Sequence, residues 1–156
     1  MITDRKIRIA VVGTGRIAGK HLHAIAEHSE DLELVAVCDS VTSAMEREDI
    51  PAGTPRFEDL ATMLSEVRPD LVSICTPSGE HPANAIICAR AGVHVMSEKP
   101  MATHWQDGLD MVEACDKAGV RLFVVKQNRL NATLQLLKRA VDAGRFGRIH
   151  MVNLNV

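Results

Sequence analysis

IRIAVVGTGRIAGK, residues 7–20, begins with an apolar run and passes directly into a glycine turn. Gly13 and Gly15 follow the run, and Ala18 stands where the strict dinucleotide fingerprint has a third glycine. A strand, a tight turn and a helix start in this order present backbone N–H groups and a positive helix end to a pyrophosphate. The stretch therefore predicts dinucleotide binding by Gly13, Gly15, Arg16 and Ile17.

The next apolar run, Leu34–Cys38, ends at Asp39, 39 − 13 = 26 positions after Gly13. That spacing is slightly longer than the usual ~20 for an acid that binds ribose hydroxyls. Ser40 follows, at a position where proteins that bind a 2′-phosphate often carry arginine. Asp39 and Ser40 are therefore expected to bind NAD rather than NADP, although Arg47 leaves NADP open. The alternative is a solvated acid at a strand end.

Strands alternate with amphipathic helices along the whole chain, and the strands are almost continuously apolar. This pattern is typical of a parallel sheet covered on both faces. The fold class is α/β, with a Rossmann-type doubly wound parallel sheet. We expect strands over residues 7–12, 33–38, 56–57, 71–75, 93–96 and 120–125. We expect helices over residues 16–27, 41–48, 58–67, 79–91, 103–118 (capped by Thr103) and 131–143.

Composition excludes several classes of protein. The net charge of −2 and the 3% aromatic content argue against nucleic acid or an anionic membrane as a partner. No run approaches the ~20 apolar residues of a membrane span, and the first residues do not resemble a signal peptide, so we expect a cytoplasmic protein. The four cysteines lie in apolar patterns and form no close pair, which indicates buried thiols rather than disulfides or a metal site.

The last nine residues differ from the rest. Within residues 148–156, Val152, Leu154 and Val156 alternate with polar residues, as in a half-buried strand. An unpaired strand at a chain end is a liability. We therefore expect an NAD-binding domain over residues 1–147 and the start of a truncated substrate domain over 148–156. The alternative is a complete domain whose last strand pairs at a sheet edge or across a dimer.

Two loops at the carboxyl ends of strands carry further candidate residues. Thr76, Pro77 and His81 follow the strand 71–75, where ligands bind in open α/β sheets. They are expected to contact the cofactor, although a packing or capping role is the alternative, most of all for His81. Glu98 and Lys99 follow the strand 93–96. A lysine beside a cofactor can hydrogen-bond a substrate hydroxyl, with Glu98 orienting it, and a surface ion pair is the alternative.

GTGRIAGKH, CDS, TPSGEH and EKP occur in this order, followed by KQNR and AGRFGRI. Together they resemble the glucose–fructose oxidoreductase/inositol dehydrogenase (Gfo/Idh/MocA) family. The resemblance covers nearly the whole chain, and Glu98-Lys99-Pro100 is its most specific part. It implies an NAD-dependent oxidoreductase acting on a sugar or nucleotide sugar, and within the family the sequence is most similar to members that oxidise C3 of UDP-N-acetyl-glucosaminuronic acid in lipopolysaccharide synthesis.

The resemblance also implies roles for individual residues. Lys99 would be catalytic and contact the substrate. Glu98 is also expected at the cofactor. Asn128 and Arg129 follow the strand 120–125 and are expected to contact sugar or phosphate, and a helix start with a solvated arginine is the alternative. The acid/base histidine of the family comes from a second domain, so these residues alone are expected to bind cofactor without efficient catalysis. A homo-oligomer is expected for the full-length protein, with no metal.

Two other functions remain open at this point. A non-catalytic NAD-binding regulatory domain fits the glycine turn equally well, and a methyltransferase using S-adenosylmethionine shares the strand–turn–helix start. Glu98-Lys99-Pro100 favours the enzyme, and the two glycines followed by a small residue and a later acid favour the dinucleotide.

Overall fold

The computed structural model describes residues 4–153 of the chain. It divides into two compact units, Met1–Val125 and Lys126–Val156. In its described part, residues 4–125, the first unit holds six strands in one parallel sheet: β1 (Ile7–Val12), β2 (Leu32–Cys38), β3 (Arg56–Phe57), β4 (Leu71–Ile74), β5 (His94–Ser97) and β6 (Leu122–Val124). Their order across the sheet is β3-β2-β1-β4-β5-β6, so the predicted doubly wound α/β fold is confirmed.

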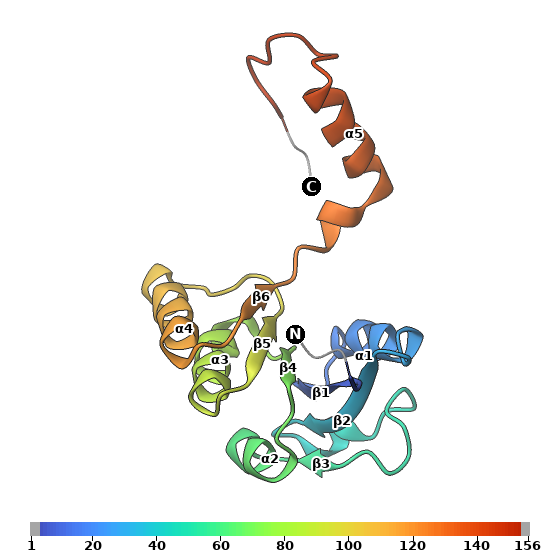
Figure 1. Ribbon diagram of the computed structural model, residues 1–156, viewed down its shortest axis with the longest axis vertical. Coiled ribbons are helices and arrows are strands. Elements are labelled where there is room, and N and C mark those ends of the chain that lie inside the picture. The colour runs from blue at the N-terminus through green and yellow to red at the C-terminus, as the bar shows by residue number, and fades with distance from the viewer. Residues whose placement is uncertain (1–3, 154–156) are drawn as a thin grey trace. The chain divides into compact units, whose positions relative to one another are not determined.

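Helices cover both faces of the sheet in Figure 1. They are α1 (Ala18–Glu27), α2 (Leu60–Val67), α3 (His81–Arg90) and α4 (Trp105–Ala118), with short 3₁₀ turns at η1 (Thr42–Met45) and η2 (Ser78–Glu80). Side chains along β1 alternate between the two faces, as strand geometry requires. Ile9 and Val11 pack under α1, and Ala10 and Val12 belong to the core beneath α2, α3 and α4.

The chain adds its first strands on one side of β1 and its later strands on the other side. From β1 the chain winds outward to β2 and β3, and it then returns through α2 to β4 and continues to β5 and β6 on the other side. The carboxyl ends of β1 and β4 therefore diverge into different loops, which is where open α/β sheets bind ligands.

Several expected elements are shorter or of another type. Residues 41–48 form only the η1 turn, and the segment expected as a helix from residue 79 starts with η2 before α3. Thr103 does not cap α4: the helix begins at Trp105, with His104 at the cap position. A threonine is a good cap by residue type, but the backbone turns into the helix only after His104.

The second unit carries η3 (Gln127–Leu130) and α5 (Ala132–Asp142), the latter capped by Asn131, whose side chain accepts the N–H of Thr133. No strand forms over residues 148–153, so the expectation of a strand there is wrong; its last three positions lie outside the described residues. Alternating residues make a strand only where a neighbouring strand takes its hydrogen bonds. Among residues 4–153, no helix is long and apolar enough to cross a bilayer.

Candidate functional site

A hollow of about 720 Å³ lies at the carboxyl ends of β1, β2 and β4. Eight of the residues predicted to bind the cofactor line it: Gly13, Gly15, Arg16, Ile17, Asp39, Ser40, Thr76 and Pro77. Three strand ends thus bring residues from distant parts of the sequence into one crevice. We call this hollow the sheet-end crevice.

The glycine turn has the shape that a dinucleotide requires. Gly13 has φ +81°, and a Cβ placed there would lie 2.6 Å from the backbone nitrogen of Thr76, so only glycine fits between β1 and the loop after β4. A Cβ on Gly15 would meet no atom within 4 Å and would project into open space beside the crevice. Gly13 therefore serves the packing, and Gly15 leaves room for a ligand to approach the backbone.

The start of α1 offers donors to that ligand. Ala18, the first residue of α1, is fully buried, and its small side chain lets α1 lie close to the sheet. In the described part of the chain, the backbone N–H groups of Gly15, Arg16 and Ile17 donate to no protein acceptor. These groups, at the positive end of the helix, fit a diphosphate.

Asp39 closes the crevice on the side of β2 and also shapes the glycine turn. Its Oδ2 accepts the backbone N–H of Thr14 at 2.7 Å and the Thr14 hydroxyl at 3.0 Å, and its Oδ1 accepts the N–H of Val41 at 2.9 Å. Each carboxylate oxygen has two lone pairs, so Oδ2 is fully used and Oδ1 can accept one more hydrogen bond, from a ribose hydroxyl.

The side chain of Arg47 stabilises the glycine turn through hydrogen bonds, a role that sequence reasoning missed. Its guanidinium donates to the carbonyl oxygens of Thr14 and Gly15 at 3.2 and 3.1 Å and pairs with Asp49 at 2.6 Å. This pairing holds the pKa of the Asp49 carboxyl below its usual range. Arg47 is therefore already engaged, which argues against its reaching a 2′-phosphate. A lone arginine in a polar loop gives no sequence signal for such a role.

His81 does not line the crevice. It is 1% exposed, and its two ring nitrogens lie 2.9 Å from the carbonyl oxygen of Thr76 and 2.8 Å from that of Pro100. This geometry matches the packing role that was its alternative. Asn84, which does line the crevice, reaches the hydroxyl of Thr76 at 3.1 Å and was not predicted, because one asparagine inside a helix is not distinctive.

Glu98 and Lys99 follow β5, one strand beyond β4 at the same edge of the sheet. Glu98 is 7% exposed and accepts the backbone N–H of Lys99 through Oε2 at 3.0 Å, whereas the Lys99 side chain is exposed. The Lys99–Pro100 peptide bond is cis. Asn128 and Arg129 lie in η3, within the second unit.

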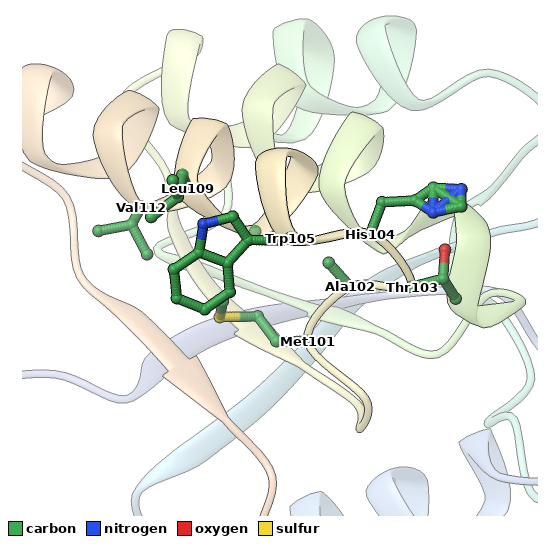
Figure 2. A pocket seen from close by; sticks show the side chains of 8 residues that line it. Met101, Ala102, Thr103, His104, Trp105, Leu109 and Val112 are labelled. Atoms are coloured by element: carbon green, nitrogen blue, oxygen red, sulfur yellow. The ribbon is translucent and has the colours of Figure 1, made fainter.

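A second hollow, of about 340 Å³, has a different character. It lies at the start of α4, where Figure 2 shows the Trp105 indole beside Met101, with Leu109 and Val112 along the helix and His104 pointing away from the indole. It shares no residue with the sheet-end crevice and contains no lysine, arginine or carboxylate. The backbone N–H groups and helix start that suit a diphosphate lie at the sheet-end crevice, and this apolar hollow has neither a cationic side chain nor such a turn.

Comparisons with known proteins agree with this geometry. The model of the oxidoreductase family with an NAD-binding Rossmann fold (GFO_IDH_MocA) matches residues 7–126. D-glucoside 3-dehydrogenase of Escherichia coli (strain K12) is 32% identical over 151 residues, which make up 96% of this chain and 43% of that enzyme.

Two solved structures are also similar. The WlbA dehydrogenase from Bordetella pertussis, in complex with NADH and UDP-GlcNAcA, is 55% identical with a TM-score of 0.90 over 94% of this chain and 45% of that one. A scyllo-inositol dehydrogenase from Lactobacillus casei with bound NAD(H) and scyllo-inositol is 26% identical with a TM-score of 0.83, over 93% and 43% of the two chains.

The chain thus spans less than half the length of each of these relatives. The match covers the sheet, the glycine turn and the loops that form the sheet-end crevice. The chain therefore belongs to the Gfo/Idh/MocA oxidoreductase family, whose NAD-binding Rossmann fold it forms.

Proposed function

We propose that this chain is the cofactor-binding part of a longer NAD-dependent dehydrogenase that oxidises a secondary alcohol of a nucleotide sugar. The observation that carries the proposal is the 55% identity, over 94% of the chain, to a dehydrogenase in complex with NADH and UDP-GlcNAcA. The inositol and glucoside relatives act on other polyols and are much less similar. The proposed substrate is UDP-N-acetyl-glucosaminuronic acid, oxidised at C3.

Residues of the sheet-end crevice hold the dinucleotide in this proposal. The N–H groups of Gly15, Arg16 and Ile17 bind the diphosphate. Asp39 and Ser40 bind the adenosine ribose, and Thr76 and Pro77 form the opposite wall. When bound, NAD supplies the nicotinamide carbon that accepts a hydride from the substrate.

Lys99 is the proposed catalytic residue of this chain. Its ammonium group donates a hydrogen bond to the hydroxyl oxygen and stabilises the negative charge that develops as the hydroxyl proton leaves. The proton passes to a base outside this chain, a histidine with a nearby aspartate, while the C–H electron pair leaves with the hydride, so the alcohol becomes a ketone. Asn128 and Arg129 contact the sugar or its diphosphate.

The proposal extends to the whole protein. Residues 1–147 form the NAD-binding domain and residues 148–156 begin the substrate domain. We propose that the full-length protein is a homo-oligomer located in the cytoplasm. Its product would serve the synthesis of lipopolysaccharide sugars.

The experiment compares full-length wild type with Lys99→Ala and with Lys117→Ala, an exposed lysine paired with Glu113 on α4. NADH production is followed with NAD and UDP-N-acetyl-glucosaminuronic acid, and the ketone position is read by NMR. Lys99→Ala is expected to bind NADH normally and to lose roughly 10²-fold or more in kcat, with Lys117→Ala unchanged. Unchanged turnover in Lys99→Ala removes the role of Lys99. NADH binding without turnover of any nucleotide sugar favours the regulatory domain instead.

A further inference from the structure

Three polar side chains in the interior form a hydrogen-bonded chain that leads to Lys99. The Oγ of Ser73 on β4 lies 2.7 Å from Nδ1 of His21 on α1, and Nε2 of His21 lies 3.0 Å from Oε1 of Glu98. Ser73 is 2% exposed, Glu98 is 7% exposed, and the His21 side chain is 11% exposed. We call this chain the His21 relay.

Donors and acceptors in the His21 relay match from one end to the other. The Glu98 carboxylate only accepts, so Nε2 of His21 carries the proton and donates to Oε1. Nδ1 is then an acceptor, and the Ser73 hydroxyl donates to it. The remaining carboxylate oxygen, Oε2, accepts the backbone N–H of Lys99 at 3.0 Å. A neutral imidazole therefore satisfies every polar group in the relay.

The His21 relay joins the two halves of the proposed site. His21 belongs to α1, whose N-terminal end faces the sheet-end crevice, and Glu98 belongs to the loop that carries Lys99. Glu98 is held from two sides, since its backbone N–H also donates to the carbonyl of Ile74 at 3.0 Å. Its carboxylate is thus fixed in direction, and the backbone of Lys99 is fixed with it.

We propose that His21 is a positioning residue for the reaction: through Glu98 it fixes the backbone of Lys99, so that the lysine side chain starts from a defined position beside the bound cofactor. The inference rests on the proposed role of Lys99. Groups that hold the orientation of a reacting residue typically change the rate when removed while leaving the binding of the ligands largely intact.

Two nearly isosteric variants of His21 test whether the hydrogen bond to Glu98, rather than the one with Ser73, carries the effect. The amide nitrogen of glutamine reaches the position of Nε2, so His21→Gln keeps the donor to Glu98. The shorter asparagine reaches only the position of Nδ1, so His21→Asn keeps the contact with Ser73 and loses the donor. In the full-length protein, His21→Asn is expected to lower kcat by roughly 10- to 100-fold, with the KM for the nucleotide sugar and the Kd for NADH changed by less than about threefold. His21→Gln is expected to keep kcat within about threefold of wild type.

A purely structural role for His21 gives a different result. Both variants then lose thermal stability alike, and kcat per folded molecule is equal in the two. That result overturns the inference, as does an equal rise in the KM and the Kd without a change in kcat.

A second measurement does not depend on turnover. Lysines of the full-length protein are labelled by reductive methylation with isotopically enriched methyl groups, and the Lys99 resonance is identified by its loss in Lys99→Ala. With NADH present, His21→Asn is expected to shift or broaden this resonance and His21→Gln to leave it in place. An unchanged resonance in His21→Asn contradicts the inference, whereas unchanged turnover in Lys99→Ala contradicts the proposed function instead.

Discussion

Gly13 and Gly15 stand two positions apart and do different work. Gly13 is pressed against the backbone of Cys75 and Thr76 with positive φ, whereas a Cβ on Gly15 meets no atom within 4 Å. The fingerprint in the sequence shows both as glycines and cannot separate the packing role from the ligand-facing one. The surroundings separate them: Gly13 is crowded by Cys75 and Thr76 in the loop after β4, and Gly15 faces open space.

Replacing Gly13 by alanine tests the packing role. We expect Gly13→Ala to lower the free energy of unfolding by about 2–6 kcal/mol, because backbone strain and a clash with backbone atoms add together. Gly92→Ala is the matched control: Gly92 also has positive φ, but a Cβ there meets no atom within 4 Å. Urea unfolding of the two variants measures the difference, and equal losses show that Gly13 is not crowded by the loop after β4.

Asp39 bears on the choice between the two nicotinamide dinucleotides. Its carboxylate lies in the crevice next to Ser40, and Arg47 is engaged with Asp49 and the glycine turn. We expect NADH to bind at least about fivefold more tightly than NADPH, because two like charges about 4 Å apart in water repel by roughly 1 kcal/mol. Fluorescence titrations at low and high salt measure both affinities; equal or tighter binding of NADPH contradicts this placement of Asp39.

At the scale of elements, α3 and α4 pack together over the sheet with Met111 and Cys115 of α4 fully or almost fully buried. We expect Met111→Ala to cost about 2–5 kcal/mol of unfolding free energy, because a fully buried methionine leaves a cavity. Met151→Ala is the control, since Met151 is 86% exposed, and it is expected to change stability by less than about 0.5 kcal/mol. If both variants unfold at the same urea concentration, α4 does not belong to this core.

Apolar runs made five of the six strands and their parallel arrangement predictable, because short continuous apolar runs between amphipathic helical patterns are typical of buried parallel strands. The exception is β3, whose two residues Arg56 and Phe57 form no apolar run. The glycine turn, Asp39 and Thr76-Pro77 were found because each directly follows such a run. Three residues were missed, because their partners lie on other elements and no local sequence pattern indicates their roles: His21, Ser73 and Arg47. Ser73 carried a weak signal: a hydroxyl inside the apolar strand Leu71–Ile74 needs a buried partner.

At residues 148–153 the sequence predicted a strand that the structure does not form. Residues 148–156 alternate like a strand, yet a strand depends on a neighbour to accept and donate its hydrogen bonds, and residues 148–153 have none. Alternation is therefore a property of the segment, whereas strand formation is a property of the segment together with its partner.

At the scale of the molecule, the buried thiols make stability depend on alkaline pH. Burial raises the pKa of Cys38 to about 11 and those of Cys75 and Cys88 to about 12, from an ordinary value of 9.0. Above pH 9.0 the unfolded chain releases these protons and the folded chain keeps them, so the free energy of unfolding falls as pH rises toward about 11. Urea unfolding at about pH 8 and about pH 10 measures the loss. A variant with all three cysteines replaced by alanine is expected to show a shallower loss, and an equal loss in that variant shows that other groups dominate.

The proposed function depends on one claim, that the crevice beside the glycine turn holds the diphosphate of NAD. Titration of NADH into full-length wild type, Gly15→Ala and Gly79→Ala tests it most directly, because a Cβ at either glycine meets no atom within 4 Å but only Gly15 lines the crevice. Gly15→Ala is expected to keep its melting temperature and to bind NADH roughly tenfold or more weakly, a loss of about 1.4 kcal/mol, with Gly79→Ala within about threefold of wild type. Unchanged NADH affinity in Gly15→Ala would contradict the claim.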